Sequence, residues 1–344
     1  MSFRLHVDGA RWRAHLRQHA ADHPGIVPVV KGNGYGFGRD VLAREAAALG
    51  VDMIAVGTYA EVPGALQDFA GDVLVLTPWR PFLDDVVLGP RVVHTVGRVE
   101  DVAALAATAP AGTRVVVEGE TSMSRHGLDR HEIAAAVAAL GDLQVEGFAL
   151  HLPLGRGHLA EAESWVAALE ASRLDTTTVL VSHLDPAEHA ELASRRPHLT
   201  IRPRIGTSLW LGDPGALSVR AHVLDVHQVE RGERIGYRQR PVPRGGYLLV
   251  VAGGTSHGIG LEAPKAVSGV VQRGKSVARG GLEAAGLSLS PFVVGGRQRW
   301  FAEPPHMHVS LVLLPESVTP PAVGDEVTAS VRFTTASFDA VVID

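Results

Sequence analysis

Short runs rich in Val and Ile alternate regularly with longer, Ala-rich segments from the start of the chain to about residue 215. The apolar runs have the length of buried strands, and the Ala-rich segments have the length and periodicity of helices. Parallel strands need a crossover connection, which is usually a helix, so this alternation predicts right-handed βαβ units around a parallel sheet. The eight expected strands are residues 26–30, 53–56, 73–76, 92–96, 114–117, 145–150, 178–181 and 200–205.

Eight βα units in about 210 residues are what a closed (β/α)8 TIM-type barrel requires. We therefore expect an α/β barrel over residues 1–215, while a doubly wound open sheet is the alternative that uses the same alternation. The expected helices include residues 39–49, 61–69, 99–108, 130–140, 160–172 and 186–195.

The sequence pattern changes after Gly212. Short apolar runs separated by Gly and Pro replace the helical periodicity, which predicts a C-terminal mainly-β domain over residues 216–344. Its expected strands are residues 219–229, 246–251, 267–271, 308–314 and 326–333. The Gly-rich stretch 279–299 is weakly patterned, so we expect a long loop there.

Composition narrows the possible functions. The 344 residues are 46% hydrophobic with a formal net charge of -5, which argues against general nucleic-acid binding. The sequence has no cysteine, so disulfides, thiolate metal sites and cysteine nucleophiles are excluded, and we expect no metal site. No apolar run reaches membrane-spanning length and no signal peptide is apparent, so we expect a cytoplasmic protein without a membrane partner.

Polar residues follow several expected strands at their carboxyl ends, where the catalytic groups of a barrel lie. Lys31 is one of three lysines among 32 basic residues, and its amine can lose a proton that arginine retains. A lysine beside backbone N–H groups and hydroxyls that hold a phosphate is what a phosphorylated aldehyde cofactor needs. The other strand-end residues are Thr121, Met123, Arg125, His151, Ser182, His183, Arg204, Gly206, Thr207 and Ser208.

Three segments carry a family resemblance. VVKGNGYGFG resembles the cofactor segment V-x-K-A-N-A-Y-G-H-G of the alanine racemase family, which are fold-type III pyridoxal-phosphate enzymes. SMSRHG resembles the family's T-G-M-x-R-x-G, and RPRIGTSLWLG resembles R-x-G-I-x-L-Y-G, in the same order. The resemblance spans the expected barrel. It implies a pyridoxal 5'-phosphate cofactor, racemization of a small amino acid and a homodimer.

The resemblance also implies roles for residues of the cofactor site. Lys31 corresponds to the lysine that holds the cofactor as an internal aldimine and exchanges the Cα proton. Tyr35, Gly206 and Thr207 correspond to phosphate ligands, and Ser182 is a looser match on the phosphate side. Arg204 corresponds to the residue that faces the pyridine nitrogen.

Two further residues take roles near the substrate by the same resemblance. Arg125 corresponds to the arginine that approaches the phenolic oxygen and the substrate carboxylate, for which a bidentate guanidinium is suited. His151 is expected beside the cofactor ring or hydrogen-bonded to Arg204.

The C-terminal part departs from the family pattern. The stretch VVAGGTSHGIG places Gly254 where the family has the tyrosine of the partner subunit that serves as the opposite base. In EPPHMHVS, Met307 matches the segment that helps to bind the substrate carboxylate, but His308 stands at its aspartate position. The lysine that is often carbamylated in the family corresponds to Glu118.

These departures leave several hypotheses open. A racemase can retain two bases if a histidine replaces the tyrosine, and His257, His306 and His308 are the candidates because histidine titrates near neutrality. Alternatively, the reaction has changed to decarboxylation or another one-base reaction. A non-catalytic pyridoxal-phosphate carrier is the third hypothesis, which the long C-terminal part disfavours.

Overall fold

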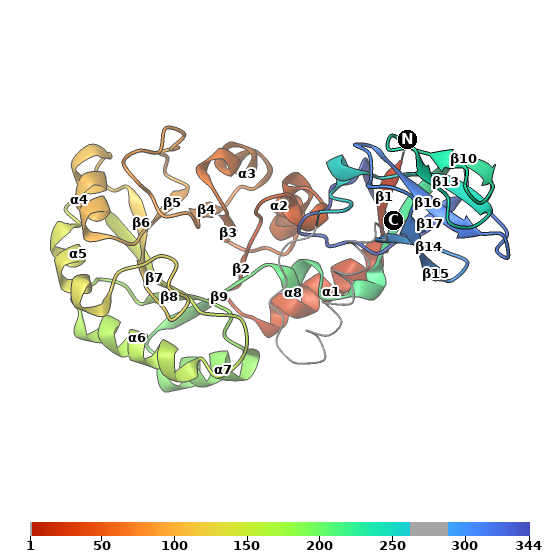
Figure 1. Ribbon diagram of the computed structural model, residues 1–344. Coiled ribbons are helices and arrows are strands. Elements are labelled where there is room, and N and C mark those ends of the chain that lie inside the picture. The colour runs from red at the N-terminus through yellow and green to blue at the C-terminus, as the bar shows by residue number, and fades with distance from the viewer. Residues whose placement is uncertain (1, 262–287) are drawn as a thin grey trace. The chain divides into compact units, whose positions relative to one another are not determined.

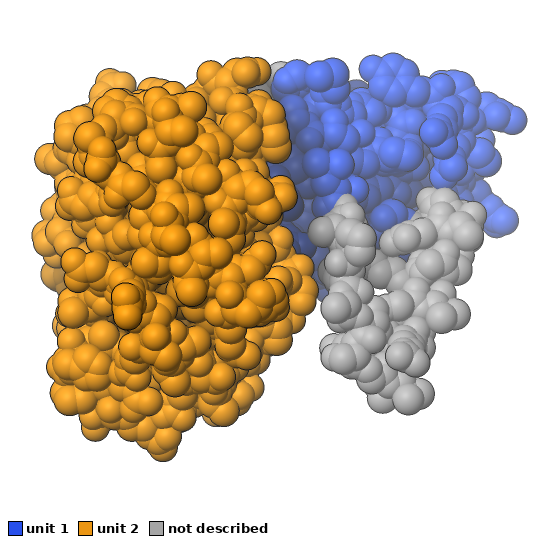
Figure 2. All heavy atoms as spheres, turned by 90° about the vertical axis from the view of Figure 1, so that its left-hand side faces the viewer, with its two compact units in different colours: residues 1–12, 213–344 blue, residues 13–212 orange. Residues whose placement is uncertain are grey.

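The computed structural model describes residues 2–261 and 288–344. The chain divides into two compact units, one of residues 13–212 and one of residues 1–12 together with 213–344 (Figure 2). The division falls within helix α1 (Gly9–Asp22), so the first twelve residues group with the C-terminal part of the chain. A domain boundary after residue 215 remains a prediction.

Unit 13–212 is a parallel barrel. The strands are hydrogen-bonded in the order β2-β9-β8-β7-β6-β5-β4-β3, and a parallel bridge between Val29 and Ala55 closes the ring. The expected barrel is therefore confirmed over the open sheet. Its strands are β2 (Val27–Pro28), β3 (Met53–Val56), β4 (Asp72–Val75), β5 (Val92–Val96), β6 (Arg114–Gly119), β7 (Gln144–His151), β8 (Thr178–Ser182) and β9 (Thr200–Ile205).

Helices alternate with these strands, and Figure 1 shows α4 to α7 outside the ring. Strands β3 and β5 are buried along their whole length, and β3 accordingly reads as an unbroken apolar run, whereas β5 includes the buried His94 and Thr95. The helices are α2 (Arg39–Ala48), α3 (Val62–Asp68), α4 (Val99–Thr108), α5 (Ile133–Ala139), α6 (Leu159–Ala171), α7 (Pro186–Arg195) and α8 (Thr207–Trp210), with short 3-10 turns η1 (Gly34–Gly36), η2 (Tyr59–Glu61) and η3 (Arg130–Glu132).

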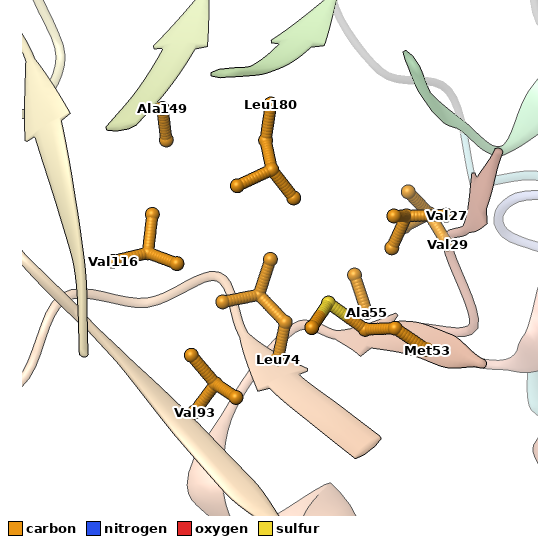
Figure 3. Packing of buried hydrophobic residues seen from close by; sticks show 9 residues of the cluster. All are labelled: Val27, Val29, Met53, Ala55, Leu74, Val93, Val116, Ala149 and Leu180. Atoms are coloured by element: carbon orange, nitrogen blue, oxygen red, sulfur yellow. The ribbon is translucent and has the colours of Figure 1, made fainter. Parts of the chain in front are cut away.

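The inside of the barrel is filled by small and medium apolar side chains that point toward one another (Figure 3). Every barrel strand except β9 contributes one or two of them, so the interior is a packed core. Side chains alternate between the two faces of a strand, and therefore the residue two places beyond an inward-facing one also faces inward. The cluster consists of Val27, Val29, Met53, Ala55, Leu74, Val93, Val116, Ala149 and Leu180.

The other unit is built on one large, mostly antiparallel sheet in the order β13-β16-β15-β14-β17-β10-β1-β18. Because β13 also pairs with β10, six of these strands form a closed ring of pairings. The strands of this unit are β1 (Phe3–Val7), β10 (Leu217–Val229), β11 (Arg234–Ile235), β12 (Arg240–Pro241), β13 (Gly246–Ala252), β14 (Leu289–Val294), β15 (Arg297–Phe301), β16 (Val309–Pro315), β17 (Glu326–Ala329) and β18 (Ala340–Ile343), and its 3-10 turns are η4 (Pro214–Ala216) and η5 (Thr255–His257).

The prediction of a long loop over residues 279–299 is wrong for residues 288–299, the part that the structure describes. Strands β14 and β15 form a hairpin in which Val294 pairs with Arg297. The two residues between them, Gly295 and Gly296, both have positive φ, which is the signature of the two-residue hairpin turn. The strand expected over residues 267–271 lies outside the described residues. In the part of the chain that the structure describes, no helix is long and apolar enough to cross a membrane.

Candidate active site at the carboxyl end of the barrel

The polar residues of the barrel mouth continue the inward-facing rows of the apolar core. Lys31 lies two places beyond Val29, and Glu118 lies two places beyond Val116. His151 and Ser182 continue the rows of β7 and β8 in the same way and are register partners. Arg204 pairs in register with the inward-facing Val27. The alternation therefore brings Lys31, Glu118, His151, Ser182 and Arg204 to one end of the barrel.

The loop that carries Lys31 has an unusual backbone. Gly32 and Gly34 have positive φ, and so do Gly36, Gly38 and even Tyr35. Glycine adopts this conformation without steric cost, which explains why glycine recurs at every second position of GNGYGFG. The Arg39 side chain donates a hydrogen bond of 2.5 Å to the Gly32 carbonyl and helps to close the loop.

Lys31 lies among positive groups. Partial desolvation lowers the pKa of its amine, the guanidinium groups of Arg125 and Arg204 lower it further, and Glu61 opposes them. Among the described residues, no carboxylate forms an ion pair with any of these three cations. A neutral amine is therefore more accessible at Lys31 than at an ordinary surface lysine.

Arg204 is buried in the barrel, with 3% of its surface exposed. Its Nε donates to Ser182 Oγ at 3.1 Å, and its Nη2 donates to the Leu150 carbonyl at 3.0 Å. Burial lowers its pKa, and the charge of Glu118 opposes that shift. The guanidinium is thus aimed by a hydroxyl and a carbonyl. Ser182, expected on the phosphate side, accepts a hydrogen bond from Arg204.

His151 and His183 contact each other edge to face, with 4.9 Å between ring centroids. Desolvation and the positive charges of Arg204 and Arg125 lower the pKa of His151 to about 3. His183 Nδ1 donates to the Leu152 carbonyl at 2.9 Å, and burial lowers the pKa of His183 as well. Both rings are therefore neutral at physiological pH, so neither supplies a charge to the mouth.

The loop after β6 presents Arg125, and neighbouring segments hold it. Thr121 Oγ1 donates to the His151 carbonyl at 2.5 Å. Glu161, on α6, accepts from the Ser122 backbone N–H at 2.6 Å and from the Ser122 hydroxyl at 2.7 Å. The Arg125 side chain itself is exposed, as is Met123 in the same loop.

Glu118 is buried, and its Oε2 has no hydrogen-bond partner among the described residues. Burial raises the pKa of this carboxyl, and the charges of Arg204, Arg125 and Arg80 oppose the shift. An unpaired buried acceptor is costly, so such a group is a candidate for a functional role.

Tyr35, Gly206 and Thr207 form a small cradle at the start of α8. Tyr35 is buried and its hydroxyl hydrogen-bonds the Thr207 side chain; burial raises the pKa of Tyr35 to about 12. A Cβ at position 206 would collide with the Tyr35 hydroxyl, so only glycine fits there. Trp210 Nε1 donates to the Val29 carbonyl at 2.9 Å and ties α8 to the strand before Lys31.

In the other unit, His257 is engaged at both ring nitrogens. Its Nδ1 accepts from the Gly254 N–H at 3.2 Å, and its Nε2 donates to Asp339 Oδ1 at 3.1 Å. A Cβ at position 254 would collide with the backbone of His306 and Met307. The space that a tyrosine at position 254 would need is therefore filled by main chain.

The remaining residues expected in this unit lie on the loop before β16. His306 Nε2 donates to Oε1 of the buried Glu303 at 2.6 Å, and the ring packs against Tyr237 with 4.4 Å between centroids. Met307 and His308 are exposed. His257 and His306 are both oriented by a carboxylate, but His257 uses both ring nitrogens within the unit, so His306 is the better candidate for a base.

Three acidic residues of the barrel mouth were not predicted as functional. Glu61 and Glu161 bind backbone N–H groups of the loops that carry Lys31 and Arg125, and Glu118 was noted only at the position of a family lysine. Their sequence signal is weak, because acids near helix starts are common. Within residues 2–261 and 288–344, no group of three or more potential ligands can hold a metal ion.

The fold and the site define a barrel protein with one lysine among arginines at its mouth, followed by a separate β unit. The family model for the alanine racemase N-terminal domain matches residues 10–212, and the chain belongs to this family. An alanine racemase of Desulfovibrio desulfuricans is 31% identical over 157 residues. That match covers 42% of this chain and 42% of the relative, so the aligned part spans less than half of that protein.

Solved structures confirm the fold. The alanine racemase from Bartonella henselae, whose structure has covalently bound pyridoxal phosphate, has a TM-score of 0.69 at 17% identity, with 96% of this chain and 90% of that chain covered. The alanine racemase from the D-cycloserine producer Streptomyces lavendulae has a TM-score of 0.64 at 22% identity, with 96% and 87% covered. Barrel and β unit together thus have the alanine racemase fold.

Proposed function

We propose that this chain is a pyridoxal-phosphate-dependent enzyme that racemizes a small amino acid. The observation that carries the proposal is the position of Lys31, whose amine has a lowered pKa and shares one barrel mouth with Arg125 and Arg204. Membership of the alanine racemase family supports the same conclusion.

The residues of the mouth fit the cofactor. An amine with a lowered pKa attacks an aldehyde carbon at lower pH than an ordinary lysine does. Tyr35 and Thr207 offer hydroxyl groups for a phosphate, and Gly206 leaves room for the Tyr35 hydroxyl beside the start of α8. Arg204 has no carboxylate partner among the described residues and provides a fixed positive charge for the ring nitrogen.

When bound, the cofactor supplies an electron sink that makes the Cα proton of an amino acid acidic. Lys31 Nζ then accepts that proton on its side of the substrate and returns it. The Arg125 fork holds the substrate carboxylate. Arg204 stays charged at neutral pH, and a ring nitrogen held beside it would remain unprotonated. His151 remains neutral and donates no proton.

A one-base reaction such as decarboxylation is a second candidate. The observation that favours it is the packing at Gly254, where main chain occupies the space of the family's second base. Racemization then requires another proton donor and acceptor, and His306 with Glu303 is the pair best arranged for that task.

The assembly and location are part of the same proposal. We propose that the chain acts on a small amino acid, because the similar solved structures are alanine racemases. The family resemblance supports a homodimer. A sequence without cysteine fits a location in the cytoplasm.

The test is Cα hydrogen–deuterium exchange of separate L- and D-amino acids in heavy water, with chirality measured in the same samples. Exchange with inversion supports racemization, and Lys31→Ala serves as the control that removes it. Exchange without inversion, or release of carbon dioxide, supports the one-base reaction. Absence of exchange, of inversion and of carbon dioxide across the panel contradicts both.

A further inference from the structure

Glu61 binds the backbone on both sides of the Lys31 side chain. It lies on η2, just before α3, and only 9% of its surface is exposed. Its Oε1 accepts from the Gly32 N–H at 2.8 Å, and its Oε2 accepts from the Gly57 N–H at 2.7 Å. Both carboxylate oxygens are thus engaged with main chain, one on the Lys31 loop and one at the end of β3.

These two hydrogen bonds act on a segment that needs support. Gly32 follows Lys31 directly and has positive φ, and a Cβ built there would meet none of the described atoms within 4 Å, so hydrogen bonds with Glu61 and Arg39 take the place of side-chain packing. Gly57 is held in turn, because the Thr77 hydroxyl donates to its carbonyl at 2.6 Å. A Cβ at position 57 would lie 3.2 Å from the Lys31 Cβ, so the anchored strand end directly adjoins the lysine. Glu61 therefore fixes the Lys31 backbone to the barrel.

Glu61 also carries the negative charge that acts on Lys31. Arg125 from the β6 loop and Arg204 from β9 disfavour the charged ammonium. His151 on β7 and His183 after β8 also face it, but both rings are neutral at physiological pH. Glu61 alone among these groups favours the ammonium.

We propose that Glu61 is the positioning residue for Lys31: its carboxylate clamps Gly32 to Gly57 and balances the positive neighbours of the amine. This inference deepens the proposed function, because Lys31 is the residue through which it acts. The clamp itself is a property of the chain without cofactor. Glu61 hydrogen-bonds neither the Lys31 amine nor any other side chain of the mouth among the described residues.

Glu61→Gln removes the charge and leaves one acceptor oxygen for two N–H donors, so it disrupts the clamp with little change in size. Glu61→Asp retains the charge on a shorter side chain that cannot reach both donors. The readout is the titration of the lysine side chains by nuclear magnetic resonance in the cofactor-free protein. The chain has three lysines, and Lys31→Arg identifies the signal of Lys31.

We expect Lys31 of Glu61→Gln to titrate at lower pH than in the wild type, because a negative charge near the ammonium is gone. Glu61→Asp should titrate close to the wild type. Both variants should bind pyridoxal phosphate roughly tenfold more weakly, since in each a backbone N–H loses its hydrogen bond to a charged acceptor. Glu45→Gln is the control: Glu45 pairs with Arg13 on the surface, and its loss should change neither quantity.

An unchanged Lys31 titration in folded Glu61→Gln, together with unchanged binding in both variants, would overturn the proposal. If Glu61→Gln does not fold, Glu61→Asp decides, and wild-type cofactor affinity in it overturns the clamp. Failure of the proposed function looks different. The wild type would then form no covalent adduct with pyridoxal phosphate, while the titration of the cofactor-free protein would still test Glu61.

Discussion

The basic side chains of the barrel mouth and those of the loops around Gly254 differ in whether they pair with acids. At the mouth, Lys31, Arg125 and Arg204 have no carboxylate partner among the described residues, and the nearby acids Glu61 and Glu161 bind backbone N–H groups instead. In the other unit, by contrast, His257 and His306 each pair directly with an acid.

This difference separates groups kept available for chemistry from groups used to build the fold. A cation whose loop is held by its backbone keeps its hydrogen-bonding capacity for a ligand, whereas a side chain with every polar atom satisfied has little left to offer. By this criterion the side chains of Lys31 and Arg125 are available to bind a ligand, whereas the hydrogen bonds of His257 stabilise the fold. His306 is intermediate, because Glu303 orients one ring nitrogen and the other has no hydrogen bond with the part of the chain that the structure describes.

The largest expected effect comes from removing the amine of the mouth. Lys31→Ala should abolish covalent attachment of pyridoxal phosphate, because Lys31 supplies the amine of the barrel mouth. The sequence has two other lysines, Lys265 and Lys275, and neither belongs to the proposed site. Borohydride reduction followed by peptide mass mapping measures the attachment, and Lys265→Ala is the matched control that should retain it. Wild-type labelling of Lys31→Ala would refute the assignment of the site.

The next prediction tests whether the second unit contributes a base. His306→Gln should reduce inversion of a racemized substrate by about 100-fold, the lower range for a general acid–base group, while exchange on the Lys31 side continues. His257→Gln should leave the ratio of inversion to exchange unchanged, since both nitrogens of His257 are bound within the unit. Equal loss of inversion in both variants would mean that the availability criterion is wrong.

The barrel was predictable from local sequence because its strands are buried on both faces. The bounds of strand β5 (Val92–Val96) and strand β9 (Thr200–Ile205) coincide with the strands predicted there, although β9 carries two arginines and is only partly buried. The same alternation that fills the core also brings Lys31 and Arg204 to one end of the barrel, so the motif residues could be grouped before any geometry was known.

Other features depend on contacts between distant segments. Strand β1 is five residues long and pairs Phe3 with Ala221, a partner more than 200 positions away, so no local pattern reveals it. The β14–β15 hairpin did have a signal, the Gly295–Gly296 pair, which was masked by the glycine-rich surroundings. Glu61 could not be assigned because its partners are backbone N–H groups, which leave no trace in residue types.

A moderate effect is expected from loosening the Arg125 loop. Glu161→Gln removes the charge that accepts two hydrogen bonds from Ser122, and charged acceptors contribute about 1.5 kcal/mol or more. We expect KM for the amino acid to rise about tenfold, with kcat changed less, because Arg125 is proposed to bind the carboxylate. Glu163→Gln is the control, because Glu163 lies on α6 like Glu161 but forms a surface ion pair with Arg195 of α7. A change in kcat alone would argue against a carboxylate-binding role for the loop.

The smallest expected effect concerns the His257–Asp339 pair, the structural side of the comparison. Asp339 accepts from the Phe3 N–H at 2.8 Å and from His257, and these hydrogen bonds hold the pKa of its carboxyl below the usual value. A group whose pKa is depressed by folding stabilises the protein above its unfolded pKa, and this contribution is lost as the pH falls through the folded pKa. The carboxylate is exposed, so screening limits the contribution to about 1 kcal/mol.

Urea unfolding should therefore show Asp339→Asn less stable than the wild type at pH 7, with a smaller difference at pH 4 and unchanged cofactor attachment at Lys31. An equal difference at both pH values would mean that the charge of Asp339 does not stabilise the fold, and a loss of attachment would mean that this pair is not merely structural.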